Sequence, residues 1–273
     1  DVTATVENLS LIASSIMSKK LAIGSDAIIL DVKVGSGAFM KNIDEAIALA
    51  KEMVEIGEGY GREAIALVTN MDEPLGNAVG NALEIKEAID TLQGNGPKDL
   101  YELCLELGSR LLLLAKRVGN EKEGKFLLEE VIENGAAYNK LLELVKIQGG
   151  DIEYIKKPEL FPKSKYIIEV KSPSGGYVKS LNAEEIGKVA LSLGAGRETL
   201  DTVIDLSAGL VLNKKIDDKV GIDDILAYIH CNDIEKGKAA EKRIKELYII
   251  GDKNKENKKL IYGIVTKEGV QLF

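Results

Sequence analysis

The sequence has few of the residues that build metal centres and disulfide frameworks. It contains two cysteines, one histidine and no tryptophan in 273 residues. Cys104 and Cys231 lie far apart, and no CxxC, HxH or HExxH pattern occurs. We therefore expect neither a disulfide framework nor a transition-metal site, and the cysteine usage indicates a reducing, cytoplasmic compartment. Cys104 falls within an apolar helical pattern, which predicts a small buried thiol.

Long apolar runs and an excess of positive charge are also lacking. No stretch reaches the ~18 apolar residues that a membrane helix needs, and the flanks of the apolar segment 9–17 are in the wrong order for a secretory signal. The 36 basic and 44 acidic residues give a net charge of −8, which disfavours binding to a phosphate backbone. The one dense basic stretch, 253–259, is typical of a solvated loop. We expect neither a membrane nor a nucleic acid as a partner.

The sequence does contain the composition of a globular protein, with 45% hydrophobic and 29% charged residues. A chain of this length favours one larger domain and one smaller domain. The spacing of apolar residues predicts a helix at 8–21, a buried strand of the parallel type at 27–34, a capped helix at 42–59 and a second strand at 64–69. This strand–helix–strand order predicts a parallel crossover and an α/β fold.

The second half of the chain has a different pattern. Helices are predicted at 81–92, 100–117, 122–134 and 136–148, and the apolar centre of 100–117 predicts that this helix is buried. Prolines indicate a linker near 156–164. Beyond it we expect a compact α+β domain rather than a continued parallel sheet, with helices at 183–193 and 233–247 and short strands at 166–170, 176–179, 209–212, 225–230 and 260–265.

The end of the strand 27–34 is the first candidate site. Ligands of open parallel sheets bind beyond the carboxyl ends of the strands. Asp31, Lys33, the loop Gly35-Ser36-Gly37 and Phe39 lie there. Glycines allow close approach of a ligand, and an aromatic ring there could stack on another ring. The same residues equally suit a tight turn with Phe39 in the core and Lys33 paired with Asp31.

The opening helix carries the second candidate. Ser15 and Lys19 are four residues apart and therefore share a face, flanked by Leu11, Ile12 and Ile16. A hydroxyl and an ammonium framed by aliphatic side chains would suit a flat polar heterocycle. Without further information, an exposed lysine and a tolerated serine explain the same spacing.

His230 is the only histidine and the third candidate. A lone histidine can act as a general base. It lies at the end of a predicted strand, however, and no serine or cysteine nucleophile is near it in the sequence. We therefore assign it a structural role.

Three long motifs resemble the thymidine/pyrimidine-nucleoside phosphorylases. They are DVTATVENLSLIASSIMSKKLAIGSDAIILDVKVGSGAFMK, MDEPLGNAVGNALEIKEAI and GNGPKDLYELCLELGSRLL. The resemblance continues to the C-terminus through SGGYVKSL, LGAGR and LVLNKKIDDKV, so it covers the whole chain. Asp217 stands where the family usually has glycine.

The resemblance implies a fold, an activity and a set of base-binding residues. It implies the remnant of a helical domain at 1–22, an α/β domain with a mixed or parallel sheet at 23–155, and a smaller C-terminal α+β module at 165–273. Family members are homodimers that cleave pyrimidine nucleosides such as thymidine, uridine and deoxyuridine with inorganic phosphate, giving the base and a pentose 1-phosphate. Ser15 and Lys19 match the residues that hold the pyrimidine edge, with Lys19 as the catalytic cation. Ile12, Ile16 and Phe39 match the apolar wall.

The resemblance also implies ligands other than the nucleoside. Inorganic phosphate is the co-substrate, no organic cofactor is expected, and bacterial members bind a monovalent cation such as K⁺. Leu75, Ala78 and Glu87 match three of the cation ligands, two of them through backbone carbonyls. The family places its phosphate-binding segment, the other cation ligands and a base-contacting arginine upstream of the residue that matches Asp1.

Because the family places these residues upstream of Asp1, three interpretations are open. We expect a pyrimidine-nucleoside phosphorylase whose activity requires the upstream segment, so that the chain alone is inactive. One alternative is a fragment that keeps only base-binding and dimerisation surfaces. The other is a related family-3 glycosyltransferase of the phosphoribosyltransferase type.

Overall fold

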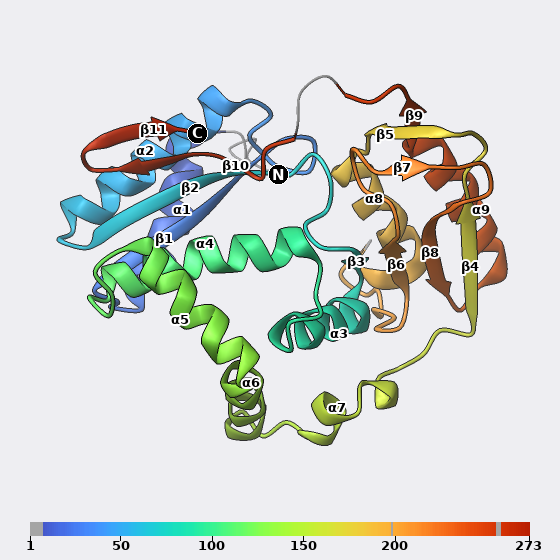
Figure 1. Cartoon of the computed structure of the whole chain (residues 1–273), viewed down its shortest axis with the longest axis horizontal. Coiled ribbons are helices and arrows are strands. Elements are labelled where there is room, and N and C mark those ends of the chain that lie inside the picture. Colours follow the sequence, from blue (N-terminus) through green and yellow to red (C-terminus); the bar gives the residue numbers. More distant parts are fainter. Residues whose placement is uncertain (1–7, 198, 255–257) are drawn as a thin grey trace. The chain divides into compact units, whose positions relative to one another are not determined.

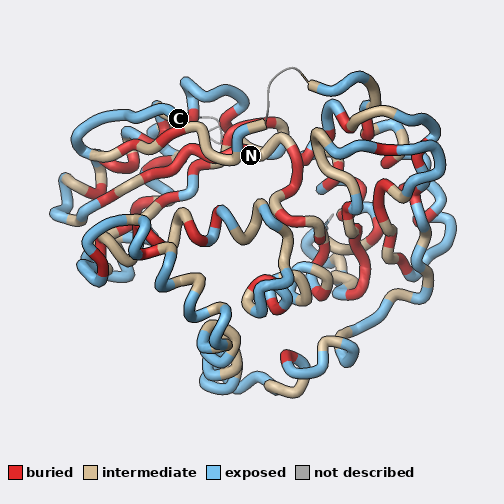
Figure 2. The backbone as a smooth tube through the Cα atoms, in the orientation of Figure 1, coloured by how far each residue is buried: buried red, intermediate tan, exposed pale blue. Residues whose placement is uncertain are grey.

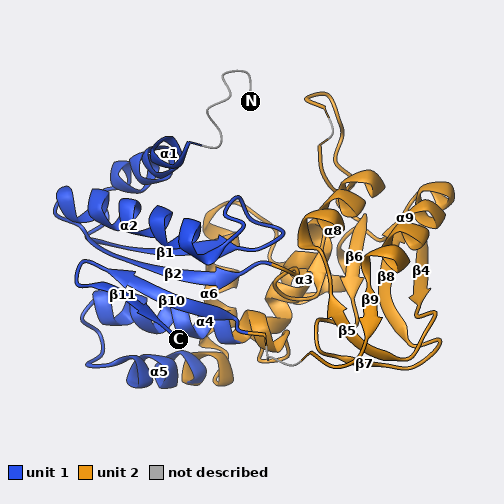
Figure 3. Ribbon diagram, turned by 90° about the horizontal axis from the view of Figure 1, so that it is seen from above, with its two compact units in different colours: residues 1–71, 102–129, 259–273 blue, residues 72–101, 130–258 orange. Residues whose placement is uncertain are grey.

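The structure is a computed structural model that describes residues 8–197, 199–254 and 258–273 (Figure 1). The chain forms two compact units, which Figure 3 colours separately. Unit 1 takes Asp1–Met71, Glu102–Glu129 and Lys259–Phe273, and unit 2 takes Asp72–Tyr101 and Glu130–Lys258. Each unit is therefore assembled from separate segments of the sequence. In the described ranges, no helix has both the length and the apolar composition that crossing a membrane requires.

Unit 1 is built on a four-stranded sheet in the order β1-β2-β10-β11. β1 (Ala27–Val34) and β2 (Glu63–Asn70) pair in parallel with each other. β10 (Ile261–Thr266) pairs antiparallel with β2, and β11 (Gly269–Leu272) pairs antiparallel with β10. The sheet is mixed, as the sequence predicts for the α/β part.

Helix α2 (Ile43–Gly59) packs against both parallel strands, and helix α1 (Leu9–Ala22) packs against α2. Asn42 caps α2, since its Oδ1 accepts the N–H of Glu45 at 3.0 Å. Buried apolar residues recur along α2 every three or four positions, and alternate residues of β1 are buried with them (Figure 2). One shared apolar core therefore fixes α1, α2 and β1 in place.

Unit 2 contains two antiparallel sheets, in the orders β3-β6-β8-β4 and β7-β5-β9. The strands are β3 (Ala78–Val79), β4 (Tyr166–Lys171), β5 (Gly176–Ser180), β6 (Gly209–Leu212), β7 (Lys219–Val220), β8 (Ile225–Cys231) and β9 (Ile249–Gly251). The helices are α3 (Asn81–Leu92), α6 (Ala136–Ile147), α7 (Glu153–Lys156), α8 (Ala183–Ala190) and α9 (Ile234–Leu247), with short turns at Pro158–Leu160 and Leu191–Ala195. Helices α4 (Lys98–Leu114) and α5 (Glu121–Glu133) each begin in one unit and end in the other.

Two facing glycines bring α3 close to β6. Gly80 precedes α3 with φ 142°, and Gly209 opens β6 with φ 152°. A Cβ on Gly209 would stand 2.3 Å from the carbonyl oxygen of Val79, and a Cβ on Gly80 would stand 2.5 Å from that of Ala208. Only glycine permits both the positive φ and this approach.

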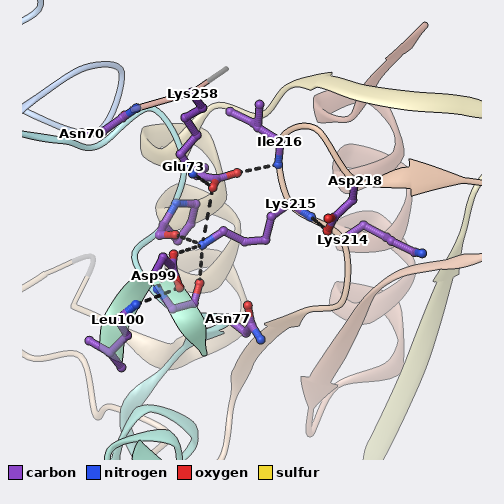
Figure 4. A network of polar contacts seen from close by, with 12 residues as sticks. Asn70, Glu73, Asn77, Asp99, Leu100, Lys214, Lys215, Ile216, Asp218 and Lys258 are labelled. Atoms are coloured by element: carbon purple, nitrogen blue, oxygen red, sulfur yellow. Dashed lines mark hydrogen bonds and ion pairs between the residues drawn. The ribbon is translucent and has the colours of Figure 1, made fainter. Parts of the chain in front are cut away.

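A buried ion network holds the segment that leads into α3 (Figure 4). Glu73 is only 4% exposed. Its Oε2 accepts the N–H of Ile216 at 2.7 Å, and the Lys258 ammonium donates to its Oε1. A buried carboxylate without such partners would be strongly destabilising. Glu73 therefore ties the chain before α3 to the turn after β6.

Lys215 supplies the second half of the same network. Its ammonium donates to the carbonyl oxygens of Pro74 at 2.5 Å and Gly76 at 2.7 Å, and to Asp99 Oδ2 at 2.6 Å. These three bonds use all the hydrogens of the ammonium. The Lys215 side chain is 15% exposed, so its charge is largely shielded from water. The loop from Pro74 to Ala78 is thus folded around a tethered cation.

The structure corrects four predictions. The strand predicted at 260–265 is present as β10 but belongs to the sheet of unit 1, so its placement among the C-terminal strands is wrong. Helix α4 is amphipathic rather than buried all round, because Leu111 is 48% exposed, and Cys104 is exposed as well. Lys258 is not part of a solvated loop, since it pairs with Glu73. Residues 255–257 lie outside the described ranges.

The resemblance implies a glycine at the position of Asp217. Its φ is 74°, in the left-handed region that asparagine and aspartate tolerate better than most residues. The turn is then held on both sides, because the Asp217 N–H donates to the Val178 carbonyl at 2.8 Å and its Oδ1 accepts from Asn254. The chain therefore makes this tight turn with aspartate in place of glycine.

Replacing Gly209 with alanine tests the close approach of α3. We expect Gly209→Ala to lower the free energy of unfolding by about 2 kcal/mol or more, because the positive φ and the contact with Val79 both oppose a Cβ. Gly187→Ala is the matched control, since a Cβ at Gly187 in α8 meets nothing within 4 Å. Urea unfolding of both variants measures the difference, and equal effects would contradict the role of Gly209.

Replacing Lys215 with methionine tests the ion network. We expect Lys215→Met to lower the free energy of unfolding by about 3 kcal/mol, because it leaves Asp99 and two carbonyls of the loop without their shared donor. Lys214→Met is the control, since Lys214 lies 3.6 Å from Asp224 in a more exposed pair and should cost less than about 1 kcal/mol. A loss of similar size in both variants would show that the network does not hold the loop.

Candidate functional site

α1 places its predicted residues in two neighbouring rows. Ile12 and Ile16 form one row, and Ser15 and Lys19 form the other. Because a helix turns by about 100° per residue, the two rows lie about 60° apart. The isoleucines are half-buried, while Ser15 and Lys19 are exposed.

The side chains of Ser15 and Lys19 meet, as their spacing predicts. The Lys19 ammonium donates to the Ser15 carbonyl oxygen at 2.5 Å and to Ser15 Oγ at 3.0 Å. An exposed ammonium held by its own helix can turn towards a ligand at small cost. The pair therefore forms an adjustable polar edge beside the isoleucine row.

A cavity of about 300 Å³ lies next to that row in unit 1. α1, β1, α2 and the loop after β1 all contribute to its wall. The apolar lining consists of Ile12, Ile16, Leu30, Val32, Ala38, Phe39, Met40, Leu49 and Met53. The structure thus brings together the three residues that the resemblance assigns to the apolar wall.

Phe39 lies at the rim of this cavity and not in the core. Its side chain is 73% exposed, which is unusual for a phenylalanine. An exposed ring at the mouth of an apolar cavity is placed to stack on a ligand that enters it. Ser15 and Lys19 do not line the cavity and lie on the neighbouring face of α1.

Asp31 and Lys33 also line the cavity, and Thr69, outside the lining, bonds to both. Lys33 Nζ lies 2.6 Å from Asp31 Oδ2 and donates to Thr69 Oγ1 at 3.0 Å, and Thr69 in turn donates to Asp31. The parallel register places Lys33 directly opposite Thr69. The predicted pairing of Lys33 with Asp31 is therefore confirmed. Thr69 was missed, although two adjacent parallel strand ends could have suggested it.

The residues matched to a cation site lie around the loop that Lys215 holds. Glu87 Oε2 accepts the N–H groups of Asn77 at 2.9 Å and Ala78 at 3.0 Å. Burial raises the pKa of the Glu87 carboxyl, while these N–H groups and Lys215 oppose the shift. A half-buried carboxylate of this kind is stabilised by a nearby cation.

Gly76 lets Glu87 reach the loop. Its φ is 71°, and a Cβ there would stand 2.2 Å from Glu87 Oε1. Ala78 and Glu87 line one cavity of about 460 Å³ in unit 2, but Leu75 does not line it. Two of the three residues that match cation ligands, Ala78 and Glu87, therefore line the same cavity.

His230 lines two cavities of unit 2. It sits on β8 opposite Gly209 and Ile167 of the neighbouring strands. Burial lowers the pKa of His230, and the charge of Lys86 lowers it further. A neutral imidazole is thus part of the wall of those cavities.

Two protein families match parts of this chain. Residues 177–251 match the family described as pyrimidine nucleoside phosphorylase C-terminal domain, and residues 1–138 match the glycosyl transferase family, a/b domain. The first of these matches favours the nucleoside phosphorylases over the phosphoribosyltransferases.

Individual relatives extend the likeness along most of the chain. Pyrimidine-nucleoside phosphorylases of Staphylococcus haemolyticus and Staphylococcus aureus are each 53% identical to it over 232 residues, and that of Staphylococcus epidermidis is 51% identical. Each alignment covers 85% of this chain and 54% of the relative, so the chain spans about half the length of these relatives. With identity this high over this much of the sequence, the chain belongs to the pyrimidine nucleoside phosphorylase family.

Proposed function

We propose that the chain provides the pyrimidine-binding part of an enzyme that cleaves pyrimidine nucleosides with inorganic phosphate. The observation that carries this proposal is the cavity of unit 1, where Ile12, Ile16 and Phe39 form one wall. A flat heterocycle can place its faces against these residues. Its polar edge then lies towards the Ser15–Lys19 row of the same helix.

The reaction breaks the glycosidic C–N bond and forms a C–O bond between C1′ and a phosphate oxygen. The electron pair of the broken bond goes to the departing pyrimidine, which becomes negatively charged. An ammonium that turns towards that ring stabilises the charge as it develops. Lys19 has this role, and Ser15 orients the ring edge by hydrogen bonding. The products are the free base and a pentose 1-phosphate.

A monovalent cation such as K⁺ would fit beside Glu87. The N–H of Ala78 points to Glu87 and not to β6, and in an extended residue the carbonyl points to the same side as the N–H. A carboxylate and a backbone carbonyl are the hard oxygen ligands that such an ion needs. Bound there, the ion would supply positive charge to a half-buried carboxylate and brace the loop, and Leu75 would add a second carbonyl.

Association of two chains is part of the proposal for the whole enzyme. The resemblance implies a homodimer, and α1 leaves Leu11 49% exposed, with Ile23 just beyond it at 77%. Apolar side chains so exposed beside a binding site favour contact with another surface.

Replacing Lys19 tests its role in the reaction. In a chimera that joins the upstream part of the Staphylococcus aureus relative to this chain, we expect Lys19→Ala to lower kcat for uridine and thymidine about 100-fold or more, because one donor to a developing charge is lost. Lys20→Ala is the matched control, since Lys20 is the next exposed lysine of α1. Release of free base, followed by its absorbance, is the measurement.

The same assay can reject the proposal. A chimera that folds but releases no base from any pyrimidine nucleoside would contradict the function. Equal losses in Lys19→Ala and Lys20→Ala would contradict the role of Lys19 while leaving the function intact. Binding of uracil to the chain alone, measured by calorimetry, should fall in Phe39→Ala if the cavity holds the base.

Replacing Glu87 tests the cation. We expect K⁺ to raise the thermal unfolding midpoint relative to tetramethylammonium at equal ionic strength, because an ion that binds the folded state stabilises it. In Glu87→Gln this difference should vanish. Glu84→Gln is the control on the same helix, since Glu84 accepts only the N–H of Gly80 among the described residues. A K⁺ effect of equal size in both variants would argue against Glu87 as a ligand.

A further inference from the structure

Lys86 and His230 form a shared wall between two cavities of unit 2. The larger cavity, which Ala78 and Glu87 line, also contains the carboxylate of Asp90. The second cavity has a volume of about 290 Å³. Its lining consists of Leu83, Lys86, Pro162, Lys163, Ser164, Ile167, Ser207 and His230. Two lysines and no carboxylate therefore line the second cavity.

The cationic groups of the second cavity lack partners in the described part of the chain. Lys86 is half-buried, yet no carboxylate of the described residues lies within ion-pair distance of its ammonium. Lys163, on the linker after α7, is likewise unpaired among those residues. The Lys86 ammonium is therefore available for a ligand.

The hydroxyl of Ser164 is the clearest unsatisfied group. Its oxygen is shielded from solvent and has no hydrogen-bond partner within the described ranges. A buried hydroxyl in this state is unfavourable, and such a group in a folded protein calls for an explanation. Ser164 lines the second cavity, so a ligand acceptor there could satisfy this hydroxyl.

His230 and Ser207 complete the polar side of the wall. Burial and the charge of Lys86 lower the pKa of His230, so its ring is neutral and offers one N–H donor. Two carboxylates of α3, those of Glu87 and Asp90, line the larger cavity together with His230. Ser207 is fixed by its bonds to Asp205 at 2.7 Å and from Asn232 at 2.9 Å. The floor of the cavity is therefore rigid.

We propose that this second cavity is a binding site for a tetrahedral oxyanion, either inorganic phosphate or a small phosphomonoester. Lys86 and Lys163 neutralise its charge, and the Ser164 hydroxyl and the imidazole N–H donate to its oxygens. Two ammonium groups with convergent neutral donors are the chemistry that such an anion requires. The volume accommodates a phosphate with a small attached group. No residue of the base cavity takes part, so the proposal is independent of the function proposed above.

The single histidine of the chain makes the site directly observable. The imidazole proton signals of His230 are followed by NMR across the pH range in chloride and in phosphate at equal ionic strength. We expect phosphate to raise the His230 midpoint by on the order of one pH unit, because an anion beside the ring favours its charged form. A titration with ribose 5-phosphate then distinguishes a phosphomonoester site, which binds it more tightly than phosphate, from a site for free phosphate.

Variants assign the effect to this cavity. Lys86→Met and Lys163→Met should each weaken phosphate about tenfold or more, because each removes a charge-assisted bond. Lys219→Met is the control, since Lys219 is an exposed lysine of β7 that lines neither cavity and loses the same charge. Lys163 is on the surface, so its variant reports binding even if Lys86→Met unfolds. The proposal would be overturned if the His230 midpoint were the same in chloride and in phosphate. It would also be overturned if Lys163→Met bound phosphate as tightly as the unchanged chain.

Discussion

The buried carboxylate of Glu73 is the constraint on which unit 2 depends. It is almost completely shielded from water, so it must be paired wherever the chain places it. Its partners come from the turn after β6 and from Lys258, more than 140 positions along the chain. Because Ile216 and Lys215 are neighbours, the same turn also delivers the ammonium that gathers the carbonyls of the Pro74 loop. Glu73 thus selects one arrangement of the loop that bears the candidate cation ligands.

Unit 1 depends on a simpler constraint, the parallel pairing of β1 and β2. The apolar runs of both strands were clear in the sequence, and the predicted bounds of β1 agree with the structure at both ends. Helices α2 and α3 were equally predictable, because capping residues and glycines mark where each one begins and ends. Local signals sufficed wherever an element is long and its ends carry their own stop signals.

The rest of the fold depends on contacts that local patterns do not encode. β10 has the composition of a strand, but its partner is chosen by the free edge of β2, far away in the sequence. The short strands β3, β7 and β9 have two or three residues each, too few for a recognisable alternation. The exposure of Cys104 and Leu111 depends on which face of α4 packs inward.

In the candidate sites, too, local spacing predicted some neighbours, while contacts between distant segments could not be predicted. Spacing alone placed Ser15 beside Lys19 and Ile12 beside Ile16, because helix geometry fixes these neighbours. It could not show that Phe39 returns to the same cavity, since that requires the position of the loop after β1. Lys215 was missed because it stands next to Lys214 in the sequence. Only the folded turn gives the two lysines different partners, Asp224 for Lys214 and Asp99 for Lys215.

Helix α3 carries opposite charges at two consecutive positions. Lys86 and Glu87 are consecutive, so they point about 100° apart on the helix. Glu87 faces the cation loop, where the N–H groups of Asn77 and Ala78 hold it, while Lys86 borders the second cavity beside His230. Burial lowers the pKa of His230 and the Lys86 charge lowers it further, so the anion proposed to bind between the two lysines would raise that pKa again. The two consecutive residues therefore share the larger cavity, and Lys86, unlike Glu87, also lines the second one.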